Sequence, residues 1–154
     1  MYIAIDFDGT CVTHEYPRIG RDIGAVPVLK ELLSAGHKLI LFTMRSNIQD
    51  TKGNGKDIMD CKAGNYLDDA VNWFADNGID LFGVNVNPTQ KEWTSSPKAY
   101  AHLYIDDAAI GIPLNYIDNG RPYVEWRQLR CMLIDRGILT GIMPESEPRK
   151  ASQS

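Results

Sequence analysis

The sequence has few cysteines, no long apolar run and no excess of positive charge, and each shortage argues against a class of protein. The three cysteines, Cys11, Cys61 and Cys131, form neither a CxxC pair nor a zinc-binding pattern, so we expect reduced thiols in a reducing compartment. No charged-then-apolar leader precedes the first apolar stretch, and no apolar run approaches the ~18 residues that a membrane span needs. These features predict a cytoplasmic protein without membrane contact.

The net charge and the length of the chain bear on its partners and on its number of domains. A formal net charge of -4 over 154 residues gives no general attraction to polyanions, which disfavours nucleic acid as a partner, although a local basic patch is left open. The length suits one hydrophobic core, whereas two domains would be cramped. We expect a single domain over residues 1–140 and a disordered tail over the polar, proline-containing residues 141–154.

The period of the apolar residues switches repeatedly between that of a strand and that of a helix. Buried strands are expected at 1–7, 38–43, 81–85 and 102–105, and amphipathic helices at about 22–35, 66–77 and 124–136. Asp22 is expected to cap the first helix and Gly36 to follow its end. The alternation is typical of an α/β domain with a mainly parallel sheet, and it predicts a three-layer, Rossmann-like fold.

Polar groups follow three of these strands. The segment DFDGT places Asp6 and Asp8 directly after the first strand, Thr43 ends the second, and Asp106 and Asp107 follow the fourth. Because the carboxyl ends of parallel strands share one edge of a sheet, four carboxylates would meet in one crevice. Such a cluster takes up protons or holds a cation, and oxygen ligands suit Mg²⁺. The sequence therefore predicts a magnesium site.

DFDGT after a hydrophobic strand, a threonine ending the next strand, a downstream lysine and a later Asp-Asp pair together resemble the haloacid dehalogenase (HAD) superfamily. The resemblance implies a HAD-like fold and a Mg²⁺-dependent phosphatase that forms an aspartyl-phosphate. Asp6 would be the nucleophile and a metal ligand. Asp8 would be the general acid and base, and its backbone carbonyl would bind the metal. Asp107 is favoured as the other direct ligand, with Asp106 acting through water or by orienting the site.

The resemblance also implies groups that bind the phosphoryl oxygens. The hydroxyl of Thr43 and the ammonium group of Lys98 would do so, with Lys91 as an alternative to Lys98. Gly9 would let the backbone bend close to the ligand, and amide groups from Phe7 to Thr10 would donate to phosphoryl oxygens.

Two arginines and a histidine near these motifs allow more than one interpretation. Arg45 is interpreted either as a bidentate grip on a substrate anion or as a surface charge. Arg18 has the same two interpretations, with a lean towards substrate binding because its loop must pass near the site. His14 is interpreted either as a substrate contact or as a turn residue, and the turn residue is preferred.

The spacing of the motifs leaves no room for an inserted cap domain. The resemblance is therefore to small, uncapped bacterial or phage members of the superfamily, with residues 46–60 as a partial lid. An uncapped site predicts a large or extended phosphorylated substrate, such as a sugar phosphate linked to a polysaccharide, or closure by a partner subunit of a homo-oligomer. The alternatives are a phosphatase for nucleotides or nucleic-acid ends, and a phosphate-binding module without turnover.

Overall fold

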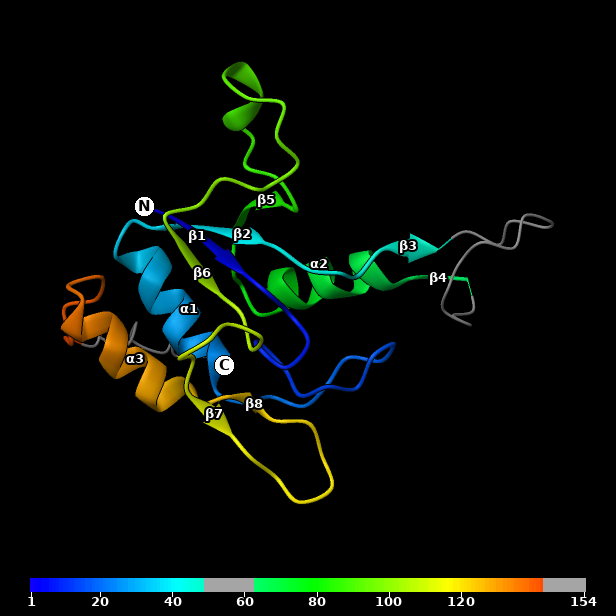
Figure 1. Cartoon of the computed structure of the whole chain (residues 1–154), viewed down its shortest axis with the longest axis vertical. Coiled ribbons are helices and arrows are strands. Elements are labelled where there is room, and N and C mark those ends of the chain that lie inside the picture. Colours follow the sequence, from blue (N-terminus) through cyan, green and yellow to red (C-terminus); the bar gives the residue numbers. More distant parts are fainter. Residues whose placement is uncertain (49–62, 143–154) are drawn as a thin grey trace, which may run out of the picture.

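The computed structural model describes residues 1–48 and 63–142 and has an α/β fold built on a four-stranded parallel sheet (Figure 1). The sheet has the order β5-β2-β1-β6, with β1 Tyr2–Ile5, β2 Lys38–Leu41, β5 Leu81–Val84 and β6 Leu103–Ile105. The helices are α1 Ala25–Ser34, α2 Tyr66–Asp76 and α3 Trp126–Asp135. The predicted fold class is confirmed, and the described residues add no further domain to this unit.

The register of the sheet decides which side chains meet at its carboxyl edge. Ile5 of β1 pairs with Leu41 on one side and with Ile105 on the other. The backbone N–H of Asp6 donates to the carbonyl of Ile105 at 2.9 Å, so the pairing continues one residue past the strand. The residues that follow β1 and β6 are therefore neighbours, although a hundred positions of chain separate them.

One face of the sheet carries the hydrophobic core. Alternate residues of β1 and β2 share a buried cluster with apolar residues of all three helices, including Ile3, Ile5, Leu39, Leu29, Phe74 and Leu129. Alternation of side chains along a strand sends every second residue to this face. The helices bury their apolar faces there, which is the expected driving force for their packing.

The opposite face carries aromatic side chains and is covered without an α-helix. The ring of Tyr2 stacks on that of Phe82, and the hydroxyl of Tyr104 donates to the carbonyl of Ala99 at 2.6 Å. The covering segment, residues 86–102, contains only the short 3-10 helix η1 Gln90–Glu92 and projects beyond β5 in Figure 1. The third layer that the sequence predicts is thus a folded loop.

The strand and helix predictions agree with the structure to within three residues, and one cap differs. The residue that caps α1 is Gly24, with a positive φ of 86°, rather than Asp22. The side chain of Asp22 instead accepts a hydrogen bond from the N–H of Gly24 at 2.8 Å. Asp22 therefore orders the turn before the helix, and Gly36, with a φ of 85°, follows its end as predicted.

Two short antiparallel pairs lie outside the predicted elements. They are β3 Asn47–Ile48 with β4 Gly64–Asn65, and β7 Leu114–Asn115 with β8 Tyr123–Val124. Each strand has only two residues, too few to produce a period in the sequence. Most of the predicted lid at 46–60 and most of the predicted tail lie outside the described residues. Within the described part of the chain, no helix is long and apolar enough to cross a membrane.

Candidate metal centre and active site

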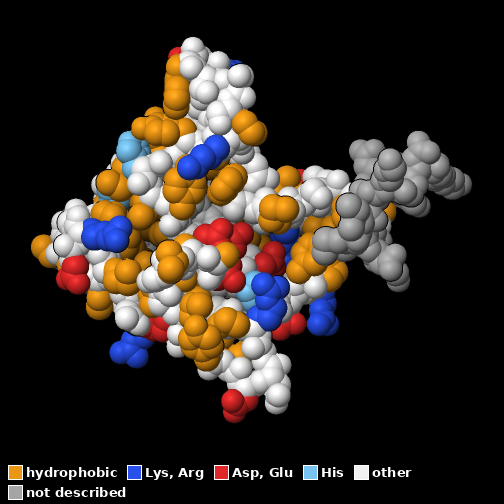
Figure 2. Space-filling model, viewed as in Figure 1, with side chains coloured by type: hydrophobic (Ala, Val, Ile, Leu, Met, Phe, Trp, Pro, Cys, Tyr) orange, Lys and Arg blue, Asp and Glu red, His pale blue; other side chains and the backbone are white. Residues whose placement is uncertain are grey.

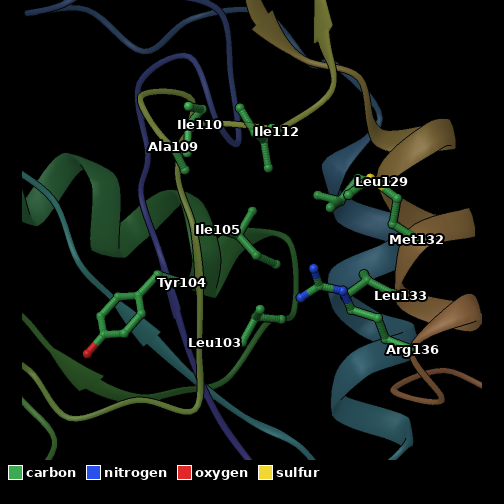
Figure 3. A pocket seen from close by; sticks show the side chains of 11 residues that line it. Leu103, Tyr104, Ile105, Ala109, Ile110, Ile112, Leu129, Met132, Leu133 and Arg136 are labelled. Carbon is green, nitrogen blue, oxygen red and sulfur yellow. The ribbon is translucent and has the colours of Figure 1, made fainter.

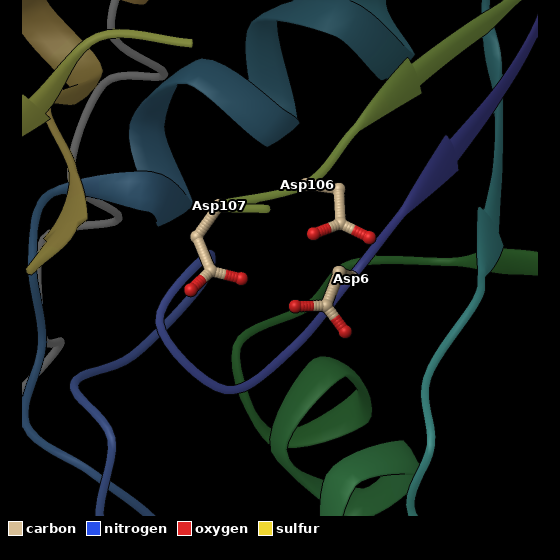
Figure 4. Close-up of side chains that lie close together, drawn as sticks. All are labelled: Asp6, Asp106 and Asp107. Atoms are coloured by element: carbon tan, nitrogen blue, oxygen red, sulfur yellow. The ribbon is translucent and has the colours of Figure 1, made fainter. Parts of the chain in front are cut away.

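Three carboxylates converge where β1 and β6 end. Asp6, Asp106 and Asp107 each offer an oxygen atom, and these oxygens all lie within 4.8 Å of one another (Figure 4). In the space-filling view, acidic side chains gather near the centre of one face, with histidine and basic side chains beside them (Figure 2). Three carboxylate oxygens are a donor set that fits a hard metal ion, so these residues could hold one.

Asp6 is the carboxyl group whose protonation the site changes most. The pKa of Asp6 is raised to about 7, mainly by burial and to a smaller extent by the negative charges of Asp106 and Asp107. Hydrogen bonds from the backbone of Phe7 and the hydroxyl of Thr10 lower this pKa, but they do not outweigh burial. A cation between these carboxylates would compensate the charge that burial makes costly, which supports a metal centre here.

Thr10 connects the two halves of the cluster. Its hydroxyl donates to Oδ2 of Asp6 at 3.0 Å and accepts from the backbone N–H of Asp107, also at 3.0 Å. The side chain is fully buried, and the backbone carbonyl accepts from the indole Nε1 of Trp126 at 2.7 Å. Thr10 therefore fixes the relative position of Asp6 and Asp107, and α3 holds Thr10 in place.

Two of the amides predicted to bind the substrate, those of Gly9 and Thr10, are hydrogen-bonded within the protein. The N–H of Gly9 donates to the carbonyl of Val12 at 2.7 Å, and the N–H of Thr10 donates to that of Phe7 at 3.1 Å. Both donors are occupied in forming the turn. These two residues therefore shape the turn that carries Asp6 and Asp8.

His14 lies at a bend of the loop after β1, and it is also a component of the site. Its Nε2 lies 2.8 Å from Oδ2 of Asp107. Both side chains are largely withdrawn from solvent, with exposed fractions of 12% and 15%. A histidine on the loop that follows DFDGT was the available signal, but its partner lies 93 positions away.

Asp8 does not join the other three carboxylates, contrary to the predicted cluster of four. Its two carboxylate oxygens accept from Nε and Nη2 of Arg45, each at 2.7 Å. Arg45 is buried, and its remaining N–H groups donate to the backbone carbonyls of Pro17, Arg18 and Tyr66. A guanidinium group has five N–H donors, and all five are engaged within the protein. The burial of Arg45 contradicts its interpretation as a surface charge, and the alternative, a grip on a substrate anion, has no N–H left to make it in this structure.

Thr43 follows the end of β2 and is held by a residue that follows the end of β5. The backbone N–H of Thr43 donates to Oδ1 of Asn85 at 2.8 Å, and its hydroxyl accepts from the N–H of Arg45 at 3.1 Å. Asn85 has a positive φ of 55°, a conformation that asparagine tolerates better than most residues. Asn85 thus supports Thr43 from the neighbouring strand, a role that its sequence context did not indicate.

The predicted basic residues lie on the covering segment or on the loop after β1. The ammonium group of Lys98 lies 5.3 Å above the ring of Tyr104, two residues before Asp106 on β6. Lys91 is exposed within η1. The Arg18 side chain is 83% exposed and lies 3.5 Å from Glu15. Lys98 is thereby placed on the sheet face that carries Tyr104, whereas Arg18 extends into solvent.

Gly9 occupies a position that should not accept a side chain. A Cβ atom at this position would overlap Nε2 of His14 and lie 2.7 Å from Oδ2 of Asp107, and the φ of 79° favours glycine. We expect Gly9→Ala to destabilise the protein by more than the roughly 1–2 kcal/mol that a positive φ alone costs, and to weaken its stabilisation by Mg²⁺.

Gly36→Ala is the matched control for Gly9→Ala. It shares the positive φ, but nothing lies within 4 Å of the added Cβ. Urea unfolding with and without Mg²⁺ measures both effects. Equal losses of stability in the two variants would show that the crowding at His14 and Asp107 is unimportant.

A separate apolar pocket lies along the open edge of β6. It has a cavity volume of about 230 Å³ and lies between β6, the turn at 109–112 and α3 (Figure 3). Its lining includes Leu103, Ile112, Leu129, Met132 and Arg136. No carboxylate is among its lining residues, so this pocket is distinct from the acidic cluster.

Comparison with known proteins identifies a structural relative. A conserved protein encoded by a locus of Bacteroides thetaiotaomicron aligns with a TM-score of 0.64 and 32% sequence identity, over 88% of this chain and 91% of that one. The chain belongs to the same family as this Bacteroides protein. No family model matches the chain, and no curated protein does.

Proposed function

We propose that the protein is a Mg²⁺-dependent phosphomonoesterase of the haloacid dehalogenase type, with Asp6 as the nucleophile. The observation that carries the proposal is the meeting of Asp6 with Asp106 and Asp107 at the carboxyl edge of the sheet. DFDGT and the Asp-Asp pair that follows β6 are the motifs that this superfamily uses, and they supply these three carboxylates.

The proposed reaction has two steps that use Asp6 and Asp8. First, a carboxylate oxygen of Asp6 attacks phosphorus and forms an acyl phosphate. The bond from phosphorus to the ester oxygen breaks, its electron pair stays on that oxygen, and a proton from the Asp8 carboxyl group converts it to the alcohol. The ionised Asp8 then takes a proton from water, whose oxygen attacks the phosphorus. The bond from phosphorus to Asp6 breaks, its electron pair returns to the Asp6 carboxylate, and inorganic phosphate leaves.

The metal ion would be held by Asp6, the backbone carbonyl of Asp8 and Asp107, with Asp106 acting through water. When bound, Mg²⁺ would offset the negative charge of the cluster and of the phosphoryl group. Asp107 is prepared for a fixed geometry, because His14 and the backbone contact to Thr10 hold it. Such supporting contacts are the usual means by which a protein orients its metal ligands.

Thr43 and Lys98 are the proposed contacts to the phosphoryl oxygens. Thr43 follows β2, which pairs directly with β1, and Asn85 and Arg45 support its backbone and hydroxyl. Lys98 lies against Tyr104, on the strand that leads into Asp106. We favour Lys98 over Lys91 for this reason.

An extended phosphomonoester is the proposed substrate class. The described residues form one sheet with its helices, and no further domain covers the carboxyl edge. A site without a cap offers few contacts to a small ligand, so part of the recognition would come from a larger substrate. A phosphorylated sugar of a polysaccharide fits this description.

The test is hydrolysis of p-nitrophenyl phosphate and acetyl phosphate by the purified protein. We expect turnover with Mg²⁺, a loss of at least about a hundredfold with EDTA, and recovery when excess Mg²⁺ is restored. Equal rates with Mg²⁺ and with EDTA would contradict the proposal. A panel of sugar phosphates, nucleotides and oligonucleotide ends then distinguishes the substrate classes.

A further inference from the structure

The pair formed by Asp8 and Arg45 is the most completely bonded polar group of the site. Both oxygens of Asp8 accept from the guanidinium group at 2.7 Å, so the plane of the carboxylate is fixed by two parallel hydrogen bonds. A single hydrogen bond would leave the carboxylate free to rotate about its last torsion angle. The bidentate contact removes that freedom.

Arg45 is itself held rigidly. Its guanidinium group lies 5.1 Å from the ring centres of both Phe7 and Tyr16. Its other N–H groups donate to the carbonyls of Pro17 and Arg18 in the loop after β1, and to that of Tyr66 at the start of α2. Arg45 is therefore held by three parts of the chain, namely Phe7, residues 16–18 and Tyr66. Because Arg45 is held in this way, it also limits the movement of Asp8.

The pair is buried on one side only. The Arg45 side chain is 1% exposed, whereas that of Asp8 is 18% exposed. Each carboxylate oxygen has a second lone pair beyond the one that Arg45 uses. The Asp8 carboxylate therefore keeps acceptor positions open to a further partner while Arg45 holds it in place.

We propose that Arg45 is a positioning residue that holds Asp8 in place to protonate the leaving oxygen; this inference rests on the function proposed above. Proton transfer in a transition state requires the acid within hydrogen-bond reach of the leaving atom. Arg45 itself touches neither the substrate nor the metal. Arg45 contributes by orienting Asp8. Its effect on the rate therefore appears only in the step in which the leaving oxygen takes up a proton.

The signature of this role is a changed dependence on the leaving group. p-Nitrophenolate leaves readily without a proton, whereas unsubstituted phenolate is more basic and needs one. Loss of a correctly placed acid should therefore slow phenyl phosphate far more than p-nitrophenyl phosphate. A residue needed only for folding would slow both substrates by the same factor.

The experiment measures kcat/KM for para-substituted phenyl phosphates at saturating Mg²⁺. For Arg45→Met, we expect the ratio of p-nitrophenyl phosphate to phenyl phosphate to rise at least about tenfold over the wild type, since general acid catalysis is worth about 10²–10⁴. Asp8→Asn should show the same rise. Arg45→Lys keeps the charge without the planar fork, so it should fall between Met and the wild type. Should Arg45→Met not fold, the lysine variant provides the comparison.

Arg130→Met is the matched control. Arg130 donates to Glu31 through Nε at 2.7 Å and Nη2 at 2.9 Å, joining α3 to α1 by the same bidentate geometry. We expect its loss to lower the melting temperature without changing the leaving-group ratio. Addition of guanidinium ion to Arg45→Ala should partly restore the phenyl phosphate rate.

The positioning role would be overturned if Arg45→Met and Arg45→Lys both had the wild-type ratio of kcat/KM for p-nitrophenyl phosphate to that for phenyl phosphate. The proposed phosphatase function would survive that result, because it depends on Asp6. Conversely, full activity in Asp6→Asn would overturn the phosphatase mechanism, whatever Arg45 shows.

Discussion

Replacing Asp6 with asparagine is expected to lower kcat for p-nitrophenyl phosphate by at least about a thousandfold, because an amide cannot form the acyl phosphate. The change is nearly isosteric, and the asparagine carbonyl can still accept the hydrogen bond that the Thr10 hydroxyl donates to Asp6. We therefore expect the variant to fold. Circular dichroism and thermal unfolding check the fold, and steady-state kinetics with Mg²⁺ measures the loss.

Asp80→Asn is the matched control for this variant. Asp80 is exposed and stands just before β5, at the amino edge of the sheet. The same chemical change there should leave kcat within about twofold, as expected for a surface position away from the site. Acid quenching of the wild type during turnover should also trap a phosphorylated protein that Asp6→Asn does not form. Undiminished turnover by Asp6→Asn is the result that would sink the mechanism.

The second large effect is a dependence of folding stability on pH in the metal-free protein. The pKa of Asp6 is raised from 3.8 to about 7 in the folded protein. Between these two values the folded chain retains a proton that the unfolded chain has lost, so its stability falls as the pH rises. The stabilising contribution is complete below about pH 4 and is lost as the pH approaches 7. This dependence is opposite to that of an aspartate in an ion pair, whose stabilising effect is lost as pH falls.

The size of the effect follows from the shift. A change of about three pKa units corresponds to at most about 4 kcal/mol, and the partial exposure of Asp6 reduces it. Urea unfolding in EDTA from pH 4 to pH 8 measures it as the difference between the wild type and Asp6→Asn. We expect Asp6→Asn to be the more stable protein at pH 8 and its advantage to shrink towards pH 4.

Mg²⁺ should reverse this ranking at pH 8. A cation favours the ionised cluster, so it should stabilise the wild type and have little effect on Asp6→Asn. Asp80→Asn should follow the wild type under every condition. A stability difference between the wild type and Asp6→Asn that does not change with pH would show that burial of Asp6 does not control its protonation.

The fold was predictable because its signals are local. Each strand of the sheet is an apolar run and each helix has an apolar stripe, and both patterns repeat over a few residues. The two-residue pairs β3–β4 and β7–β8 were missed, since they are too short to repeat any pattern. The layer over the aromatic face was also misjudged. Residues 86–102 pack through individual contacts, such as that of Tyr104 with Ala99, rather than through a helical stripe.

The candidate site was predictable where its residues adjoin strand ends. Asp6, Asp106 and Asp107 follow buried strands, and the parallel sheet brings those ends together. The interpretations of the Gly9 and Thr10 amides and of Arg45 depended on where individual donors point, and in the structure these donors are bonded within the protein. An N–H group that closes a turn and one that faces a ligand look the same in a sequence.

The sequence by itself determined which residues are buried, which strands they form and which carboxylates end those strands, because burial and period depend on neighbouring residues. Only the tertiary structure decided the partners of those carboxylates. Arg45 lies 37 positions from Asp8, and His14 lies 93 positions from Asp107. Such pairs form when the order of the strands brings distant loops to one edge of the sheet. No local sequence pattern indicates which of these distant residues will meet. Asp8 pairs with Arg45, and does not join the acidic cluster, because the fold brings these two loops together.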